Sequence, residues 1–421
     1  MALPSPSVLD ETRCMDLSVS YSCNAKCLFC SQDFAWRKED PRGMGYREAC
    51  KKVWQGYEAG YRKLAISGGD PTVLPYLDKL IAFARKTGFQ SIRLQSNGIK
   101  LADDAYVARL MDAGLTTVKF SIHGHDAATH DRLVQVPGAF DACLKAIAVL
   151  RRHHCRLGIN IVLTSENYRR LPEFFEFFIH EAGVTTFTVI YPLYSGNMVE
   201  EAGRIGVPIE DTVPYVRRGL RVFERLGLEL PTLLHFLPCL LPGYEERMIG
   251  WHRYNAQVVD PDGSDRDLDS SVKRHKTLLD SCATCVYQRR CPGIDKKYLE
   301  RFGPAAFVPV TQAPPSRVTP PTLDPRRKVL TENERCVLAL LEKGPLTTGH
   351  LLDAARKFPL CQDCRGGPAI AMAAEWLYKL GRVERRRIDG RYEWSLPVAV
   401  HQHSPAQVAA SFGRRPVRGS A

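Results

Sequence analysis

Short apolar segments alternate with amphipathic segments at helical spacing between about residues 15 and 195, and this rhythm constrains the fold more than any other feature. It predicts six β/α units and a parallel α/β sheet. The runs Leu64–Ile66 and Ile159–Leu163 are nearly continuously apolar, as expected for strands covered on both faces. Ligands of such sheets bind at the carboxyl ends of the strands. The predicted strands are Met15–Tyr21, Lys63–Ser67, Ile92–Gln95, Thr117–Ile122, Leu157–Leu163 and Thr185–Tyr191, and predicted helices include Arg47–Ala59, Leu74–Thr87 and Phe140–Arg151.

The composition is that of a globular protein with two or three domains. The 421 residues are 44% hydrophobic and 25% charged, with a formal net charge of +12. The longest apolar stretches, Phe174–Tyr194 and Leu228–Tyr244, are broken by charge, Pro and Gly, so no membrane span is expected. The first residues lack the basic start and apolar run of a secretion signal, and we expect a cytoplasmic protein.

Three cysteines follow the first predicted strand directly, as Cys23-Asn-Ala-Lys-Cys27-Leu-Phe-Cys30. In a reducing compartment, such tight spacing points to metal or redox chemistry rather than to disulfides. Three close thiolates suit a cubane iron–sulfur cluster, with one iron left open for an exogenous molecule. The alternative is a zinc site, which would need a fourth ligand and usually has regular C-x2-C pairs. We favour the cluster.

This run and the segments after the next strands resemble the radical S-adenosylmethionine (SAM) family over roughly residues 15–200. Phe29 stands where the family has an aromatic residue next to the last cysteine, which implies contact with the adenine. The segment Ser67-Gly68-Gly69-Asp70-Pro71 is similar to the family's Gly-Gly-Glu-Pro segment, which holds the methionine amino group. Here Asp70 replaces the family's Glu and is one methylene shorter.

Three further segments carry the resemblance. Gln95-Ser96-Asn97-Gly98 and Ser121-Ile122-His123-Gly124 end the third and fourth strands, and the family's groups at such positions face the SAM carboxylate and ribose. Asn160 in the fifth strand is a further ribose or adenine candidate. His130-Asp131-Arg132 resembles a downstream His-Asp-x-x-Arg element, but Val134 occupies the usual arginine position. Taken alone, Gly68-Gly69 and Asn97-Gly98 are typical of turns, and the two histidines are typical of structural hydrogen bonds. Their common place at strand ends favours one shared ligand site.

The resemblance implies a fold, an activity and partners. The fold is α/β, a partial (β/α)6 TIM-type barrel. The cofactors are a [4Fe–4S] cluster and SAM, whose reductive cleavage yields a 5′-deoxyadenosyl radical that abstracts hydrogen from a substrate. The catalytic ligands are then Cys23, Cys27 and Cys30, and an electron donor similar to flavodoxin or ferredoxin is required.

A second cysteine group is Cys239 with Cys282-x2-Cys285-x5-Cys291. Four thiolates would fully ligate another [4Fe–4S] cluster, and zinc is the main competitor. The spacing resembles the auxiliary-cluster region of radical SAM enzymes that act on peptides and other substrates, and we expect one auxiliary cluster. The pair Cys361 and Cys364 is read as a free or redox-prone thiol pair rather than a zinc knuckle. The isolated residues Cys14, Cys50, Cys143 and Cys155 are read as small buried apolar residues.

The chain after the barrel divides at a proline-rich stretch. We expect an N-terminal segment (1–15), a barrel (16–235), an auxiliary-cluster region (236–310), a linker (311–327), a winged-helix-like domain (328–398) and a disordered basic tail (399–421). The winged-helix prediction rests on three helix patterns and on Asp389-Gly390, a hairpin signal between two short β-like runs.

The predicted hairpin is basic, since it carries Arg382, Arg385, Arg386, Arg387 and Arg391. Such a stripe can track phosphates, yet the same fold serves as a peptide-docking module in radical SAM maturases of ribosomal peptides. The third helix pattern has few basic residues for groove reading, which favours peptide or protein docking. The hypotheses are therefore a radical SAM enzyme acting on a peptide or protein, one acting on RNA or a small metabolite, and an iron–sulfur sensor that binds DNA without catalysis.

Overall fold

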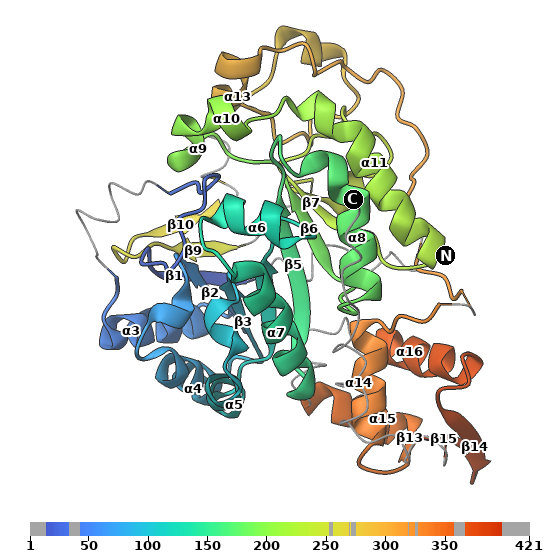
Figure 1. Cartoon of the computed structure of the whole chain (residues 1–421). Helices are drawn as coiled ribbons and strands as arrows, with labels where there is room; N and C mark the ends of the chain where they lie inside the picture. The colour runs from blue at the N-terminus through green and yellow to red at the C-terminus, as the bar shows by residue number, and fades with distance from the viewer. Residues whose placement is uncertain are drawn as a thin grey trace, which may run out of the picture. The chain divides into compact units, whose positions relative to one another are not determined.

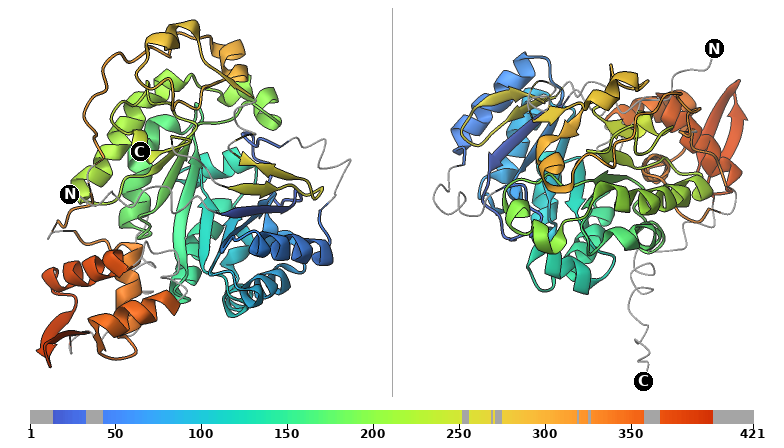
Figure 2. Two further views of the ribbon diagram at one scale, coloured as in Figure 1. Left: turned by 180° about the vertical axis from the view of Figure 1, so that it is seen from behind. Right: turned by 90° about the horizontal axis from the view of Figure 1, so that it is seen from above.

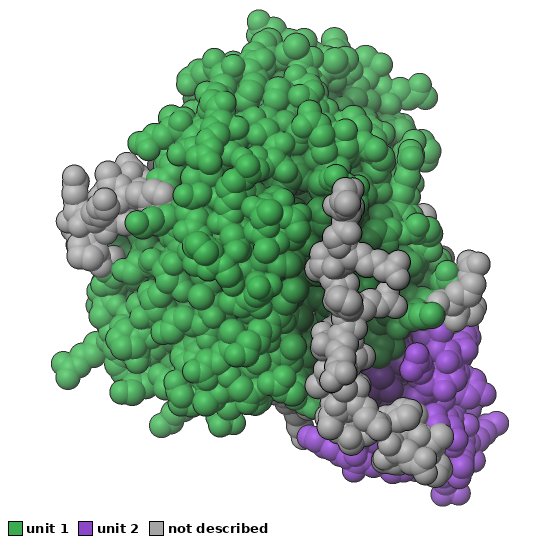
Figure 3. All heavy atoms as spheres, viewed as in Figure 1, with its two compact units in different colours: residues 1–332, 359–365 green, residues 333–358, 366–421 purple. Residues whose placement is uncertain are grey.

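The computed structural model describes residues 14–32, 43–251, 256–268, 270, 275–318, 320–324, 327–357 and 367–397. Cys361, Cys364 and the predicted tail lie outside these residues. The described chain divides into a first unit up to residue 332 and a second unit from residue 333, which Figure 3 shows in two colours. Each unit is described by itself.

The first unit is built on one ten-stranded sheet, in the order β10-β9-β1-β2-β3-β4-β5-β6-β7-β8. All neighbouring strands are parallel except β9 and β10. The strands are β1 (Met15–Ser20), β2 (Lys63–Gly68), β3 (Ser91–Ser96), β4 (Thr117–Ser121), β5 (Arg156–Val162), β6 (Phe187–Ile190), β7 (Thr232–Leu234), β8 (Met248–Ile249), β9 (Gln257–Val259) and β10 (Asp265–Asp267). The predicted α/β fold with a parallel sheet is confirmed.

Helices cover the sheet between successive strands, as Figures 1 and 2 show for α3, α4, α5 and α7. The helices of this unit are α3 (Tyr46–Glu58), α4 (Leu77–Thr87), α5 (Asp104–Ala113), α6 (Ala127–Val134), α7 (Ala139–Arg152), α8 (Leu171–His180), α9 (Asn197–Glu200), α10 (Ala202–Ile205), α11 (Ile209–Leu226) and α13 (Lys296–Phe302), with short 3-10 turns η1 (Pro71–Val73), η2 (Ile99–Ala102), η3 (Tyr168–Arg170), η4 (Glu245–Arg247) and η5 (Asp280–Thr284). A two-stranded sheet pairs β11 (Lys276–Thr277) with β12 (Ile294–Asp295).

Register explains why the strand sequences are so apolar. Leu17 lies beside Ile66, Ile66 beside Leu94, Leu94 beside Val118 and Val118 beside Leu157. All five side chains are buried, so one apolar layer crosses five strands. Removing this surface from water is the main force that holds the sheet and its helices together. The layer also aligns the carboxyl ends of β1 to β4, from which the candidate site residues extend.

Two differences from the sequence prediction concern this unit. The predicted helix Leu74–Thr87 begins only at Leu77, because Pro75 disfavours helical backbone at Leu74, which is extended. The sheet also takes in β7, which is not among the predicted strands, and β8, β9 and β10, which lie within residues 236–310, the stretch predicted as an auxiliary-cluster region. These strands have only two or three residues each, too few for a period-two pattern to stand out in the sequence.

In its described residues, the second unit combines three helices with a small sheet. Its elements are α14 (Glu332–Leu341), β13 (Leu346–Thr347), α15 (Thr348–Lys357), α16 (Gly367–Lys379), β14 (Glu384–Ile388) and β15 (Arg391–Ser395). The antiparallel pair β14 and β15 turns at Asp389-Gly390, where both residues have positive φ, as the hairpin signal predicts. Strand β13 adds to β15, so β14 is an edge strand. The winged-helix assignment remains a prediction.

A search of the described helices finds none that alone is long and apolar enough to cross a membrane. Helices α6 and α7, bent by 104° at their junction, pass only when taken together.

Candidate functional site

The three cysteines of the first group lie on one loop at the carboxyl end of β1. Cys23, Cys27 and Cys30 are all partly exposed. Two backbone bonds hold the loop to the end of α6: Lys26 N–H donates to Val134 O over 3.1 Å and Leu28 N–H donates to Leu133 O over 3.0 Å. The thiols therefore project from a loop whose backbone is fixed by the barrel.

The start of α9 holds the other side of this loop. Asn197 Nδ2 donates to Cys27 O over 3.2 Å, and Met198 N–H donates to Cys30 O over 3.3 Å. Asn197 is buried and follows β6 by a short connection. Sequence reasoning missed this contact because nothing in a lone Asn-Met pair marks it as a partner of a loop 170 residues away.

Gly68 and Gly69 let the second strand end pack directly on the cysteine loop. Gly69 N–H donates to Ser20 O over 2.7 Å, and Asp70 N–H donates to Ser22 O over 2.9 Å. A Cβ on Gly69 would lie 2.2 Å from Ser22 O, and Gly68 has a φ of +125°, a conformation that favours glycine. The pair is thus required for backbone contact with the residues next to Cys23.

The carboxylate of Asp70 accepts hydrogen bonds from neighbouring residues of the protein. One carboxylate oxygen accepts from Thr72 N–H over 2.9 Å and from its hydroxyl over 2.5 Å, and the other accepts from Ser96 Oγ over 2.8 Å and Asn97 N–H over 2.7 Å. Burial raises the pKa of this carboxyl, which is 1% exposed, while these donors oppose the rise. Asp70 therefore joins the ends of β2 and β3, and the segment offers a ligand its backbone more than this carboxylate. Ser67 likewise donates its hydroxyl to Asp16.

Asn97 comes from the end of β3 and reaches the cysteine loop. Its Nδ2 lies 2.7 Å from Asn24 Oδ1 and 3.8 Å from Cys23 Sγ. Sequence reasoning predicted Asn97 at the ligand site but gave no reason to expect a contact with a cysteine.

The fourth and fifth strands bring Ser121, His123 and Asn160 to the same end of the barrel. Ser121 lies beside Asn160 in register. The ring of His123 lies 4.2 Å from the ring of Phe29, measured between centroids. His123 Nδ1 accepts from Val162 N–H over 3.1 Å, so the proton is on Nε2. That Nε2 is a buried polar atom with no hydrogen-bond partner among the described residues.

The downstream His-Asp-Arg run has structural roles in this structure. His130 Nδ1 accepts from His123 N–H over 3.1 Å, and burial lowers its pKa to about 4. Asp131 accepts from Gly138 N–H and Phe140 N–H over 2.6 and 2.8 Å at the start of α7. Arg132 pairs with Glu166 over 2.9 Å. The run therefore positions the end of β4 and fixes the helices beyond it.

The second cysteine group brings Cys239 together with three cysteines that follow later in the sequence. Cys239, Cys282, Cys285 and Cys291 line one cavity of about 20 Å³, together with apolar residues that include Leu237, Ile294 and Phe307. Burial raises the pKa of Cys239 to about 12, and the neighbouring cysteines add to this rise. Lys276 is the nearby cation; burial lowers its pKa, and Asp295 and Cys291 oppose that change.

The two cysteine groups differ from a compact single-ion site. Among the described residues, no three or more His, Cys, Asp or Glu side chains are grouped so as to hold one metal ion. The donor set of the first group, three thiols and no fourth cysteine on the loop, nevertheless suits a cubane with one open iron. The unpartnered Nε2 of His123 and the close approach of Gly69 lie on the same side of the barrel as this loop.

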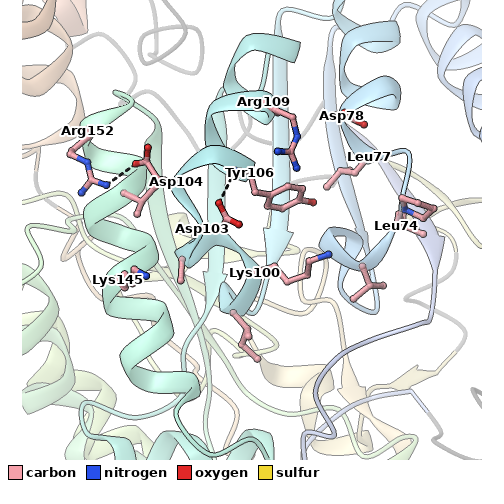
Figure 4. Close-up of a pocket in the computed structure, with 15 residues that line it drawn as sticks. Leu74, Leu77, Asp78, Lys100, Asp103, Asp104, Tyr106, Arg109, Lys145 and Arg152 are labelled. Atoms are coloured by element: carbon pink, nitrogen blue, oxygen red, sulfur yellow. Dashed lines mark hydrogen bonds and ion pairs between the residues drawn. The ribbon is translucent and has the colours of Figure 1, made fainter.

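A separate cavity of about 880 Å³ lies on the outer side of the barrel (Figure 4). It is lined by residues of α4, α5, α7 and η2, with Tyr106 between Lys100 and Arg109, and Asp104 paired with Arg152 over 2.7 Å. None of the cysteines of either group lines it. Its size alone does not make it the chemical site, because the thiols and the strand ends are elsewhere.

Comparison with protein families identifies the barrel. The radical SAM superfamily matches residues 17–178, which include the cysteine loop and the ends of β1 to β5. The chain carries a radical SAM domain. Proteins of this family use a [4Fe–4S] cluster and SAM, so the expected cofactors agree with the family.

Curated relatives of the radical SAM domain are named as enzymes. A probable GTP 3′,8-cyclase of Methanopyrus kandleri is 31% identical over 172 residues, 39% of this chain and 52% of the relative. An AdoMet-dependent heme synthase of Nitratidesulfovibrio vulgaris is 28% identical over 158 residues, 38% of this chain and 42% of the relative. The matches thus span about half the length of these relatives.

Among solved structures, the radical SAM domain and its extension are similar to SuiB of Streptococcus suis. The form bound to S-adenosylmethionine gives a TM-score of 0.54 at 16% identity, covering 71% of this chain and 76% of SuiB. The form bound to the precursor peptide SuiA gives 0.53 and covers 75% of SuiB. At this identity the likeness shows a shared fold, and it extends beyond the residues that the family match covers.

Proposed function

We propose that this chain is a radical SAM enzyme whose first cysteine group binds a [4Fe–4S] cluster and whose substrate is a peptide or protein. The observation that carries the first part is the packing of Gly68-Gly69 against the loop of Cys23, Cys27 and Cys30 at the carboxyl end of the barrel. This packing brings the strand-end groups next to the only three thiols on that loop. When bound, the cluster supplies the electron that splits SAM into methionine and a 5′-deoxyadenosyl radical.

The residues of the chain then have distinct tasks. Cys23, Cys27 and Cys30 hold the cluster, while the backbone at Gly68 and Gly69 offers polar groups beside it. Phe29 is buried against His123 and provides an apolar face for a nucleobase. Ser121 and Asn160 are adjacent on β4 and β5, which supports ribose binding by this hydroxyl and this amide. Binding at these strand ends would exclude water from the reacting groups.

The test of this activity is the formation of 5′-deoxyadenosine from SAM by anaerobically reconstituted, reduced protein. Turnover supports the enzyme and excludes the DNA-binding sensor without catalysis. No SAM cleavage, with a cluster present, would contradict the proposal.

We further propose that Cys239, Cys282, Cys285 and Cys291 hold a second, fully ligated [4Fe–4S] cluster. Their convergence on one cavity supports a shared metal site, and its apolar lining would shield a cluster from solvent. Zinc is the competing metal, because four thiolates are also a structural zinc set. Iron and zinc analysis of the reconstituted protein distinguishes the two metals, and zinc at one equivalent would overturn the cluster.

The second unit supports a peptide or protein partner rather than RNA. Arg385, in the middle of the basic stripe, pairs with Glu375 over 2.5 Å and lies over the rings of Tyr378 and Tyr392 at 4.3 and 4.5 Å. A guanidinium engaged in this way is less available to phosphates. Among the described residues, β14 pairs with β15 alone, and an extended peptide could add to its other edge as a further strand.

Binding experiments separate the two substrate classes. A peptide encoded next to the gene should bind the full chain, and RNA should not bind with strong salt dependence. The change Arg386→Ala with Arg387→Ala should leave peptide binding intact. Salt-dependent RNA binding abolished by these changes would favour an RNA substrate.

A further inference from the structure

Asn97 is held in place by its backbone on both sides. Its N–H donates to Asp70 Oδ2 over 2.7 Å, and its carbonyl accepts from Cys143 Sγ over 3.0 Å. The residue is 8% exposed, and Gly98, at a φ of +83°, turns the chain directly after it. Asn97 therefore has little freedom to swing toward or away from the cysteine loop.

The orientation of its amide is fixed by a further contact. Oδ1 accepts from Ile99 N–H over 3.1 Å, and only the oxygen of the amide can accept that hydrogen bond. Nδ2 must then point to the opposite side, where it meets Asn24 Oδ1 at 2.7 Å and Cys23 Sγ at 3.8 Å. One amide hydrogen is taken by Asn24, and the other faces the sulfur. Ala25 N–H also donates to this sulfur, over 3.4 Å.

We propose that Asn97 is a positioning residue that raises the reduction potential of the cluster by donating an N–H···S hydrogen bond to Cys23. Sequence reasoning placed Asn97 against SAM; the geometry points instead to a ligand sulfur. A donor to a thiolate stabilises the extra negative charge of the reduced cluster, and hydrogen bonds to sulfur are among the factors that set such potentials. This inference rests on the proposed cluster at Cys23, Cys27 and Cys30.

Neighbouring residues extend the same arrangement. Asp70, with four hydrogen bonds of its own, joins Asn97 to Thr72 and Ser96. Cys143, predicted from sequence as a small buried apolar residue, donates its thiol to the Asn97 carbonyl from α7. Its sulfur also lies 3.9 Å from His130 Nε2. The ends of β2 and β3 together with α7 thus hold Asn97 in place beside the cysteine loop.

The test is a redox titration of the reconstituted full chain without SAM, followed by electron paramagnetic resonance of the reduced cluster. Asn97→Ala should make reduction about tenfold less favourable, a fall of about 59 mV for one electron. Asn97→Asp keeps the acceptor for Ile99 N–H but replaces the donor with negative charge, so its potential should fall further. Asn167→Ala is the matched control, because the buried Asn167 amide contacts His123 O and Val162 O and no cysteine; its potential should stay unchanged.

A second measurement detects the proposed hydrogen bond directly. In wild-type protein with ¹⁵N in its asparagine side chains, pulsed resonance of the reduced cluster should show coupling to ¹⁵N, lost in Asn97→Asp. Unchanged potentials in both Asn97 variants, or a rise in the KM for SAM with no shift in potential, would overturn the inference and return Asn97 to SAM binding. A wild-type protein that forms no cluster would instead overturn the proposed function itself.

Discussion

The two cysteine groups of the first unit show how similar ligands can be built into different sites. Cys23, Cys27 and Cys30 lie within eight residues on one loop, between strand ends that carry polar groups. The second group draws four cysteines from separate segments into one small cavity with apolar walls. Three thiolates leave one iron of a cubane open, whereas four close it. If both groups hold cubanes as proposed, the first site can bind a further ligand and the second can store or pass electrons.

The largest expected effect comes from replacing the three cysteines of the first group. Cys23→Ala, Cys27→Ala and Cys30→Ala, alone or together, should abolish SAM cleavage, because no open iron remains. Metal bound by the second group should persist, which iron analysis and 5′-deoxyadenosine assays measure together. SAM cleavage that survives the triple change would show that the first group is not the reactive site.

The next largest effect is expected from a substitution at Gly69, which packs against the backbone of the cysteine loop. In Gly69→Ala, the new Cβ would lie 2.2 Å from Ser22 O and 2.5 Å from Tyr21 O, so the cysteine loop must move. We expect SAM binding to weaken at least about tenfold, or about 1.4 kcal/mol. Gly45→Ala is the matched control, since a Cβ there meets nothing within 4 Å. Equal SAM affinities for the two variants would contradict this account of the site.

Replacing cysteines of the second group should impair substrate turnover but not SAM cleavage. Cys282→Ala with Cys285→Ala should lower the iron content by about four atoms per chain. Substrate turnover should fall, while SAM cleavage without substrate continues, because the first group is untouched. Unchanged iron stoichiometry would show that the second group is not an iron site.

The last effect is on folding stability rather than on SAM chemistry, and it concerns the pH dependence of a buried histidine. Burial lowers the pKa of His130 from 6.5 to about 4, so below pH 6.5 the unfolded chain binds a proton that the folded chain does not. Stability should therefore fall as the pH drops from about 6.5 toward 4, by about 1.4 kcal/mol per pH unit for this residue. His130→Gln should show a shallower decline in urea midpoint over that range and the same pH dependence as wild type above pH 7. Parallel curves throughout would contradict the assignment.

The order of the barrel could be predicted because each strand carries its own local signal. Six apolar runs with helices between them predicted β1 to β6, and the dense spacing of Cys23, Cys27 and Cys30 marked the loop. Strands β7 to β10 could not be predicted, because each has only two or three residues and is ordered by pairing with its neighbours in the sheet. The convergence of Cys239 with Cys291 was proposed from cysteine count and resemblance, and spacing alone would not have placed them in one cavity.

The sequence by itself indicated the resemblance of residues 15–200 to radical SAM proteins, the cysteine loop and the strand ends near it, because these depend on neighbours within a few residues. Only the tertiary structure decided what the side chains at those ends contact. Asp70 turns into the chain rather than outward, and Asn97 directs its amide at Cys23, because partners from β3, η2 and α7 fix both orientations. Hydrogen-bond direction depends on atoms brought together across tens of residues, and a linear pattern does not carry that information.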